Sequence, residues 1–133
     1  MLEYHLSNDP LTTNQVSVAC WIKGDSFNPY NNIIFCANTS DSEDSKYYFS
    51  IINNTTLNFG INSSYTYSIS YTFATDIWYH IAATYDGDKI RLYVNGELKG
   101  TSNSLNIIPR TALNYGIMCR SYNSTGTSVG GWN

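Results

Sequence analysis

The sequence predicts an all-β domain of antiparallel strands, either a sandwich or a barrel. Apolar and polar residues alternate along most of the chain, which is typical of half-buried antiparallel strands. The chain is rich in Tyr and in β-branched residues, which favour strands, and in Asn and Ser, which favour turns. Its 133 residues, 42% of them hydrophobic, suffice for one domain with a sizeable core.

The alternation defines the strands one by one. In the second predicted strand, for example, Val16, Val18, Cys20 and Ile22 alternate with Ser17, Ala19, Trp21 and Lys23. No window shows a helical stripe with capping residues. The nine predicted strands span residues 2–7, 14–23, 32–37, 46–52, 56–62, 65–73, 77–85, 89–94 and 112–119.

Short turn sequences separate these segments. Asp86-Gly87 is a two-residue hairpin signal, and Asn95-Gly96 then turns the chain toward a short ELKGT segment. Residues 24–31 and 38–45 are the longest irregular stretches and therefore candidate functional loops.

Charge and hydropathy exclude some classes of partner. Net charge is −3 and pI about 5.1, so the chain lacks the clustered positive field that nucleic acid requires. No apolar run has the roughly 20 residues of a membrane span, and the start has no signal-peptide pattern. Each cysteine, Cys20, Cys36 and Cys119, lies in an apolar run, which predicts buried thiols and a reducing compartment of synthesis.

One segment is more specific than its periodicity. Residues 77–100 read IWYHIAATYDGDKIRLYVNGELKG and resemble the central hairpin of laminin-G-like domains, in the concanavalin A-like lectin and glucanase superfamily. The positions that carry the resemblance include Trp78, His80, Asp86, Gly87, Asn95 and Gly96. The resemblance covers roughly residues 2–119 and implies a jelly-roll of two antiparallel sheets.

These positions also have a structural interpretation. Asp86-Gly87 and Asn95-Gly96 form turns, while Trp78 and His80 share one face of a strand. Both faces of that strand are fairly apolar, which predicts a central strand covered on both sides. His80 is then a hydrogen-bonded structural residue rather than a catalytic or metal-binding one.

The chain departs from the family pattern at its C-terminal end. Laminin-G-like domains usually close with a further strand, and residues 130–133 stand where it would begin. We therefore expect an open sheet edge near residues 120–133, which either the rest of a longer chain or a partner strand completes.

The superfamily includes glucanases, but the sequence predicts no catalysis. Retaining glycosidases need two carboxyl groups about 5–5.5 Å apart, and the glucanase pattern Glu-x-Asp-x-x-Glu is absent. Asp41, Glu43 and Asp44 are the candidate calcium ligands in the loop, because calcium requires several clustered oxygen atoms. The alternative is that these acids are solvated surface charges.

Glycan binding is the role that the resemblance implies. The candidate residues are Asn28, Tyr30, Asn31 and Asn32 in the first loop and Tyr122 with Asn123 near the end. A stripe formed by Tyr65, Tyr67 and Tyr71 is predicted to face the core.

The combined prediction is a non-catalytic, glycan- or surface-binding adhesion module. Low Ala content, free thiols and the lack of a signal peptide suggest a bacteriophage virion protein, from the capsid or tail, assembled in the host cytoplasm. One alternative is a purely structural jelly-roll packed against other subunits. The other is a carbohydrate-binding appendage of a larger secreted enzyme, at the cell surface or outside the cell.

Overall fold

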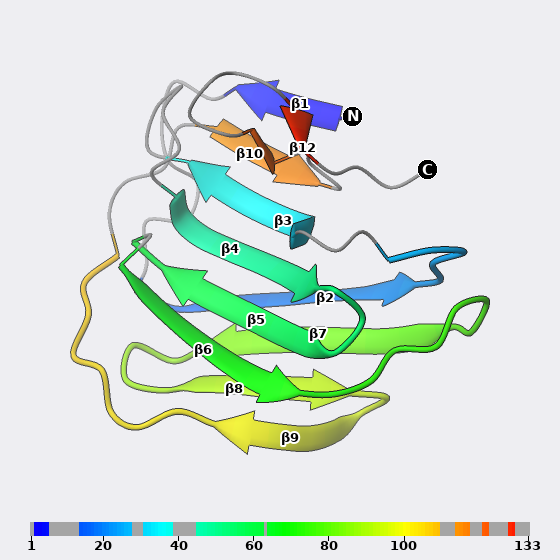
Figure 1. The fold of residues 1–133 in the computed structure, drawn as a ribbon. Coiled ribbons are helices and arrows are strands. Elements are labelled where there is room, and N and C mark those ends of the chain that lie inside the picture. The colour runs from blue at the N-terminus through cyan, green and yellow to red at the C-terminus, as the bar shows by residue number, and fades with distance from the viewer. Residues whose placement is uncertain are drawn as a thin grey trace.

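The protein forms two antiparallel sheets packed face to face, as the sequence predicts (Figure 1). The computed structural model describes residues 2–5, 14–27, 31–38, 45–62, 64–109, 114–117, 121–122 and 128–129. Its strands are β1 (Leu2–His5), β2 (Val16–Ile22), β3 (Asn31–Asn38), β4 (Ser45–Ile52), β5 (Thr56–Ile61), β6 (Tyr65–Ser70), β7 (Tyr79–Tyr85), β8 (Ile90–Val94), β9 (Glu97–Thr101), β10 (Asn114–Ile117), β11 (Ser121–Tyr122) and β12 (Ser128–Val129).

One sheet has six strands, in the order β1-β10-β3-β4-β5-β6, and the other has four, in the order β2-β7-β8-β9. β11 and β12 pair with each other in a separate two-stranded ladder. All the strand pairs are antiparallel. The jelly-roll sandwich implied by the family resemblance is therefore confirmed.

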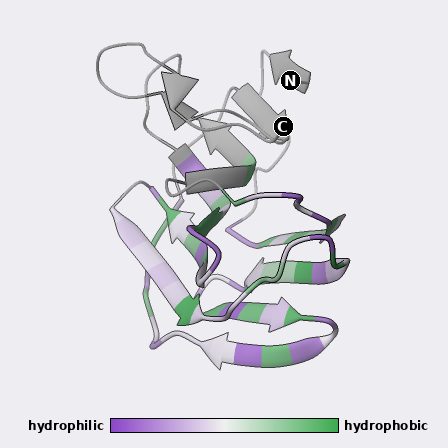
Figure 2. Cartoon of the chain, turned by 45° about the vertical axis from the view of Figure 1, so that its right-hand side comes forward, coloured by the Kyte–Doolittle hydropathy of each residue, from purple (hydrophilic) through white to green (hydrophobic). Residues whose placement is uncertain are grey.

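The core lies between the two sheets and is built from the inward side chains of alternate residues. Phe49, Ile51, Leu57, Phe59, Ile81 and Leu92 are completely buried there. Figure 2 shows the alternation of apolar and polar residues along the strands that causes this burial. Aromatic contacts hold the core together, such as Tyr47 against Phe59, with ring centroids 5.9 Å apart.

The tyrosine stripe of β6 faces the core, as predicted. Tyr65 and Tyr67 are half-buried against the core cluster, and Tyr71 continues the stripe beyond the strand. Thr66 and Ser68 between them are exposed. This stripe is therefore part of the fold and not a free platform for ligands.

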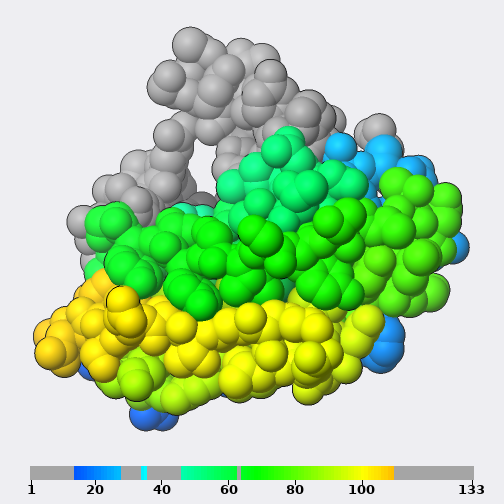
Figure 3. Space-filling view, turned by 60° about the horizontal axis from the view of Figure 1, so that its bottom comes forward, coloured from blue at the N-terminus to red at the C-terminus, as the bar shows by residue number. Residues whose placement is uncertain are grey.

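β9 is a strand that the alternation did not predict. Its sequence, ELKGT, is polar and contains Gly100, so its local preference for a strand is weak. A Cβ on Gly100 would meet Ile69 Cγ2 and the Tyr67 hydroxyl at 2.7 Å, so β9 packs closely beside β6. Figure 3 shows β9 running along β6, where the two sheets meet.

Of the two predicted two-residue hairpin turns, one forms as predicted and the other is longer. Asn95 and Gly96 both have positive φ, 52° and 79°, as a two-residue hairpin turn requires. The Asp86-Gly87 turn is longer than predicted, because β7 ends at Tyr85 and β8 begins at Ile90. Only Gly87 has a positive φ there, and side-chain hydrogen bonds close the turn.

Of the three cysteines, Cys20 is the one whose side chain lies in the described part of the chain. It is a half-buried free thiol on the inward face of β2, and burial raises its pKa above the ordinary value. Cys36 is described by its backbone within β3, and Cys119 lies outside the described residues.

Candidate functional site

Two exposed tryptophans lie in or directly beside the four-stranded sheet. Trp21 on β2 is 63% exposed and Trp78, just before β7, is 60% exposed. The expectation that the strand containing Trp78 is covered on both faces is therefore wrong. Tyr79, Ile81 and Ala83 are buried on its inner face, but nothing described covers the outer one.

Strand register brings Trp21 and His80 together on the outer face of the four-stranded sheet. Trp21 lies directly opposite His80, and their rings contact at a centroid distance of 5.3 Å. Trp78 lies two residues before His80, directly before β7, and its side chain is exposed. We call Trp21, Trp78 and His80 the aromatic platform.

The His80 side chain does not have its predicted role as a hydrogen-bonded structural residue. Its backbone N–H donates to Asn95 Oδ1 at 3.0 Å, and its backbone oxygen accepts the Asn95 N–H at 2.7 Å. The imidazole ring itself lies half-exposed against Trp21, with no hydrogen bond to any residue in the described part of the chain. The His80 side chain is therefore part of the surface.

Polar groups border the platform. Asn95 uses its Oδ1 to hold the β7–β8 hairpin, and its amide nitrogen remains on the surface. Lys23 follows Trp21 by two residues, and its ammonium lies 4.0 Å from the Asp76 carboxylate in a solvent-exposed pair of little strength. Flat aromatic faces bordered by amide and ammonium donors can bind a ring that carries hydroxyl groups.

The residues beside the platform on the same face have smaller or less polar side chains. Ala19 lies opposite Ala82, and Ala82 lies opposite Tyr93. Tyr93 in turn pairs with Leu98, whose side chain is 49% exposed. Small side chains beside the indole of Trp21 leave that ring open to a ligand.

The sequence contained a signal for Trp21 that its interpretation missed. Trp21 alternates in phase with Ser17 and Ala19, both of which are exposed. A tryptophan on the polar phase of a strand indicates a surface aromatic residue. Trp78 had no comparable signal, because its exposure depends on where β7 begins.

The outer face of the six-stranded sheet has a different character. Tyr48 lies over Gly60, its direct partner on β5, and its hydroxyl is hydrogen-bonded to Thr66. Ser50 and Asn58 face each other across the strands and are 1% and 3% exposed. Within the described residues, neither Ser50 Oγ nor Asn58 Oδ1 has a hydrogen-bond partner.

The residues predicted to bind glycans lie largely outside the described part of the chain. Asn28, Tyr30 and Asn123 are not among the described residues. Asn31 and Asn32 begin β3, and Tyr122 ends β11, which lies close to β3, but these three are described by their backbone alone. The patch they were predicted to form therefore stays a prediction.

The predicted calcium ligands Asp41, Glu43 and Asp44 also lie outside the described residues. The described residues contain no cluster of three metal-ligating side chains. Calcium binding therefore stays a prediction.

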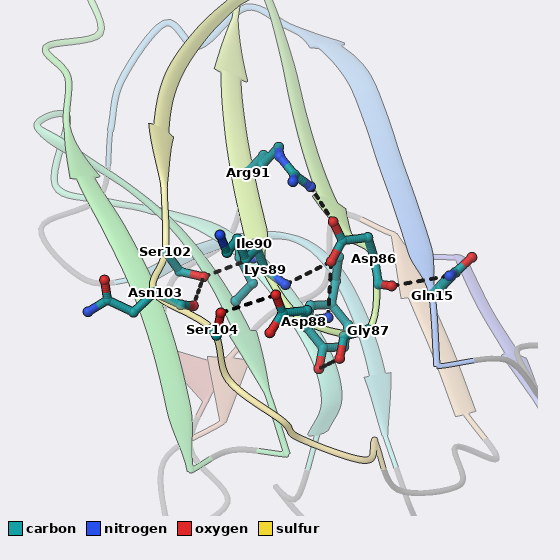
Figure 4. A network of polar contacts seen from close by, with 11 residues as sticks. Gln15, Asp86, Gly87, Asp88, Lys89, Ile90, Arg91, Ser102, Asn103 and Ser104 are labelled. Atoms are coloured by element: carbon teal, nitrogen blue, oxygen red, sulfur yellow. Dashed lines mark hydrogen bonds and ion pairs between the residues drawn. The ribbon is translucent and has the colours of Figure 1, made fainter.

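The Asp86 carboxylate forms hydrogen bonds within the β7–β8 turn (Figure 4). Its Oδ1 accepts the N–H groups of Asp88 and Lys89, and its Oδ2 accepts a hydrogen bond from Arg91 at 2.5 Å. The hydrogen bond from Arg91, followed by the two backbone N–H groups, holds the pKa of the Asp86 carboxyl well below its usual range. Asp86 is thus a structural residue, as predicted.

Residues 3–130 match the laminin-G-type profile of the concanavalin A-like lectin/glucanases superfamily. The chain belongs to that superfamily. A search of curated proteins found no match.

Several solved structures share the fold. The SAP-like pentraxin from Limulus polyphemus superposes with a TM-score of 0.71 and 22% identity, covering 98% of this chain and 63% of that one. A putative carbohydrate binding protein from Bacteroides ovatus gives 0.61 and 24%, covering 85% and 34%. The CBM40 domain of the Ruminococcus gnavus IT-sialidase, bound to α2,6 sialyllactose, gives 0.63 and 14%, covering 98% and 86%.

This chain spans less than two thirds of the pentraxin chain and about one third of the Bacteroides chain. The similar structures are mostly binding or carbohydrate-binding modules. Over the described residues, the structure has no helix long and apolar enough to span a membrane.

Proposed function

We propose that this chain is a non-catalytic glycan-binding module and that the aromatic platform is its binding surface. The observation that carries the proposal is the pair of tryptophans, each at least 60% exposed: Trp21 contacts the His80 ring, and Trp78 lies two residues before His80. A folded domain gains no stability by leaving two large aromatic rings in water. A sugar ring stacks its apolar face on such rings.

The surrounding groups support a carbohydrate over a purely apolar ligand. The Asn95 amide, the His80 imidazole and the Lys23 ammonium can each donate to a hydroxyl or carboxylate group. The comparisons support the same class, since a putative carbohydrate binding protein and a sialyllactose-binding domain share the fold. The missing glucanase motif supports binding without bond cleavage.

A glycan array followed by calorimetric titration tests the proposal. We expect binding to at least one glycan family, with no cleavage of the ligand. Trp21→Ala and Trp78→Ala should each weaken binding about tenfold, or about 1.4 kcal/mol. Ile108→Ala removes an apolar side chain that is 76% exposed outside the platform, and it should bind like the unmodified protein.

Either of two outcomes would contradict the proposal. An array without hits, repeated with calcium, would favour the alternative of a structural module. Binding that Ile108→Ala weakens as much as the tryptophan variants do would place the ligand elsewhere. The virion context stays a prediction, which mass spectrometry of purified particles tests.

A further inference from the structure

The outer edge of β2 is the least protected of the sheet edges whose side chains are described. β2 has β7 on one side and no described strand on the other. Ser17 and Ala19 are exposed, and Val18 and Cys20 on the inner face are half-buried. Sheet edges of this kind can pair with another chain, so proteins usually protect them.

Hydrogen-bond alternation identifies the free backbone groups. The Asn95 N–H donates to the His80 oxygen, so even-numbered residues of β7 bond to β8 and odd-numbered ones bond to β2. The partners of Ile81, Ala83 and Tyr85 on β2 are Cys20, Val18 and Val16. The N–H and C=O groups of Ser17, Ala19 and Trp21 therefore point toward the open side.

The other edges with described side chains are protected. β9 has a register irregularity in its pairing with β8 and an ion pair at 2.7 Å between Lys99 and Glu97. β6 lies against β9 through Gly100. β2 has none of these features, because its sequence VSVACWI contains no charge or proline and its register with β7 is regular throughout.

We propose that β2 pairs with β2 of a second copy of this chain, forming an antiparallel eight-stranded sheet across a two-fold axis at Ala19. Ala19 then lies opposite Ala19 of the second copy, and Ser17 lies opposite Trp21. This register places the three sets of free backbone groups opposite one another and forms about six hydrogen bonds. It is independent of what the aromatic platform binds.

The side chains suit this symmetric pairing. On the inner face, Val18 lies opposite Cys20 of the second copy, so two half-buried apolar side chains complete each other's burial. At the strand end, Lys23 falls opposite Gln15, so no like charges meet. The outer faces of the two sheets become continuous, with one platform on each side of the axis.

Sedimentation at a series of concentrations tests the pairing. The unmodified protein should form a reversible dimer. Ala19→Glu places two like charges opposite each other at the axis and should weaken the dimer at least about tenfold. Ser68→Glu adds the same charge at an exposed site on β6 and should leave the dimer unchanged.

Circular dichroism and thermal unfolding show whether both variants keep the fold. A protein that stays monomeric at every concentration would overturn the proposal. Equal dimerisation of the Ala19→Glu and Ser68→Glu variants would do the same.

Amide hydrogen exchange gives an independent measurement. The amides of Ser17, Ala19 and Trp21 should exchange more slowly as concentration rises, because dimerisation protects them. The amides of Val18 and Cys20 already bond to β7 and should not change. Concentration-dependent protection that spares Ser17, Ala19 and Trp21 would show that the copies meet through another surface, against the proposal.

Discussion

The outer faces of the two sheets differ in how far their side chains are exposed to solvent. On the six-stranded sheet, the Tyr48 ring covers Gly60, and the smaller side chains Ser50 and Asn58 are almost completely buried. In or directly beside the four-stranded sheet, Trp21 and Trp78 remain in solvent. The chain thus covers one outer face with its own side chains and leaves the other exposed to solvent.

Ligand recognition is expected on the sheet face that the chain leaves open. A tyrosine placed over a glycine buries apolar area and stabilises its own sheet. An exposed tryptophan gains nothing comparable until a ligand or partner covers it. The open face is therefore the one expected to bind, and changes to the two faces should have different effects.

The largest expected effect is on the stability of the self-covered face. Gly60→Ala places a Cβ into the Tyr48 ring, so we expect a loss of about 2 kcal/mol in the free energy of unfolding. Urea unfolding measures this loss, and glycan binding should not change. In a Tyr48→Ala background the loss should shrink, because the ring is absent. An equal loss in both backgrounds would show that Tyr48 is not the cause.

A charge on the open face should affect binding instead. Ala82→Glu places a carboxylate between Ala19 and Tyr93, beside the platform, and should weaken glycan binding about tenfold, or about 1.4 kcal/mol. Calorimetry with the same glycan measures the change. Ser68→Glu, on the outer face of the six-stranded sheet, serves as the matched control. If both variants weakened binding equally, the two faces would not differ in function.

The hairpin that supports the platform should show an acid dependence. The folded-state pKa of Asp86 is lowered, so its contribution is present at neutral pH and is lost as pH falls below about 4. Asp86→Ala removes the acceptor of three hydrogen bonds and should lower the free energy of unfolding at neutral pH.

Thermal unfolding between neutral and acidic pH checks this prediction. The difference between the unmodified protein and Asp86→Ala should narrow with acidification. Asp86→Asn keeps an oxygen acceptor for the two N–H groups, so it should cost less than Asp86→Ala. A pH-independent difference would show that the ionised carboxylate is not what closes the turn.

The smallest effect, with the opposite sign, is expected at Ser50. Ser50→Ala removes a buried hydroxyl that has no described partner, so stability should stay the same or rise by up to about 1 kcal/mol. Chemical unfolding measures the change, with Ser68→Ala as an exposed control. A clear loss of stability would show that the Ser50 hydroxyl binds a water molecule or another group.

Much of the fold could be predicted because its causes are local. The alternation in β2, β6 and β8 follows from the two-residue period of a strand, and Asn95-Gly96 suits the positive φ angles of its turn. β9 could not be predicted, because its polar sequence becomes a strand through pairing with β8 and contact with β6.

The candidate site shows the same division. Trp21 could have been recognised from its phase with Ser17 and Ala19, whereas the sequence interpretation favoured the Asn- and Tyr-rich loop instead. Asp86 was correctly interpreted as a turn residue, because its hydrogen bonds join neighbours in the sequence.

The sheet character, the inward residues and the superfamily could be read from the sequence, because periodicity and turn chemistry depend on neighbouring residues. The tertiary structure was needed to show which sheet face stays open, which strand forms a free edge and which rings meet. Each of these depends on pairing between distant segments, as when Trp21 meets His80 across 59 positions of the chain, and local preference carries no information about such pairing.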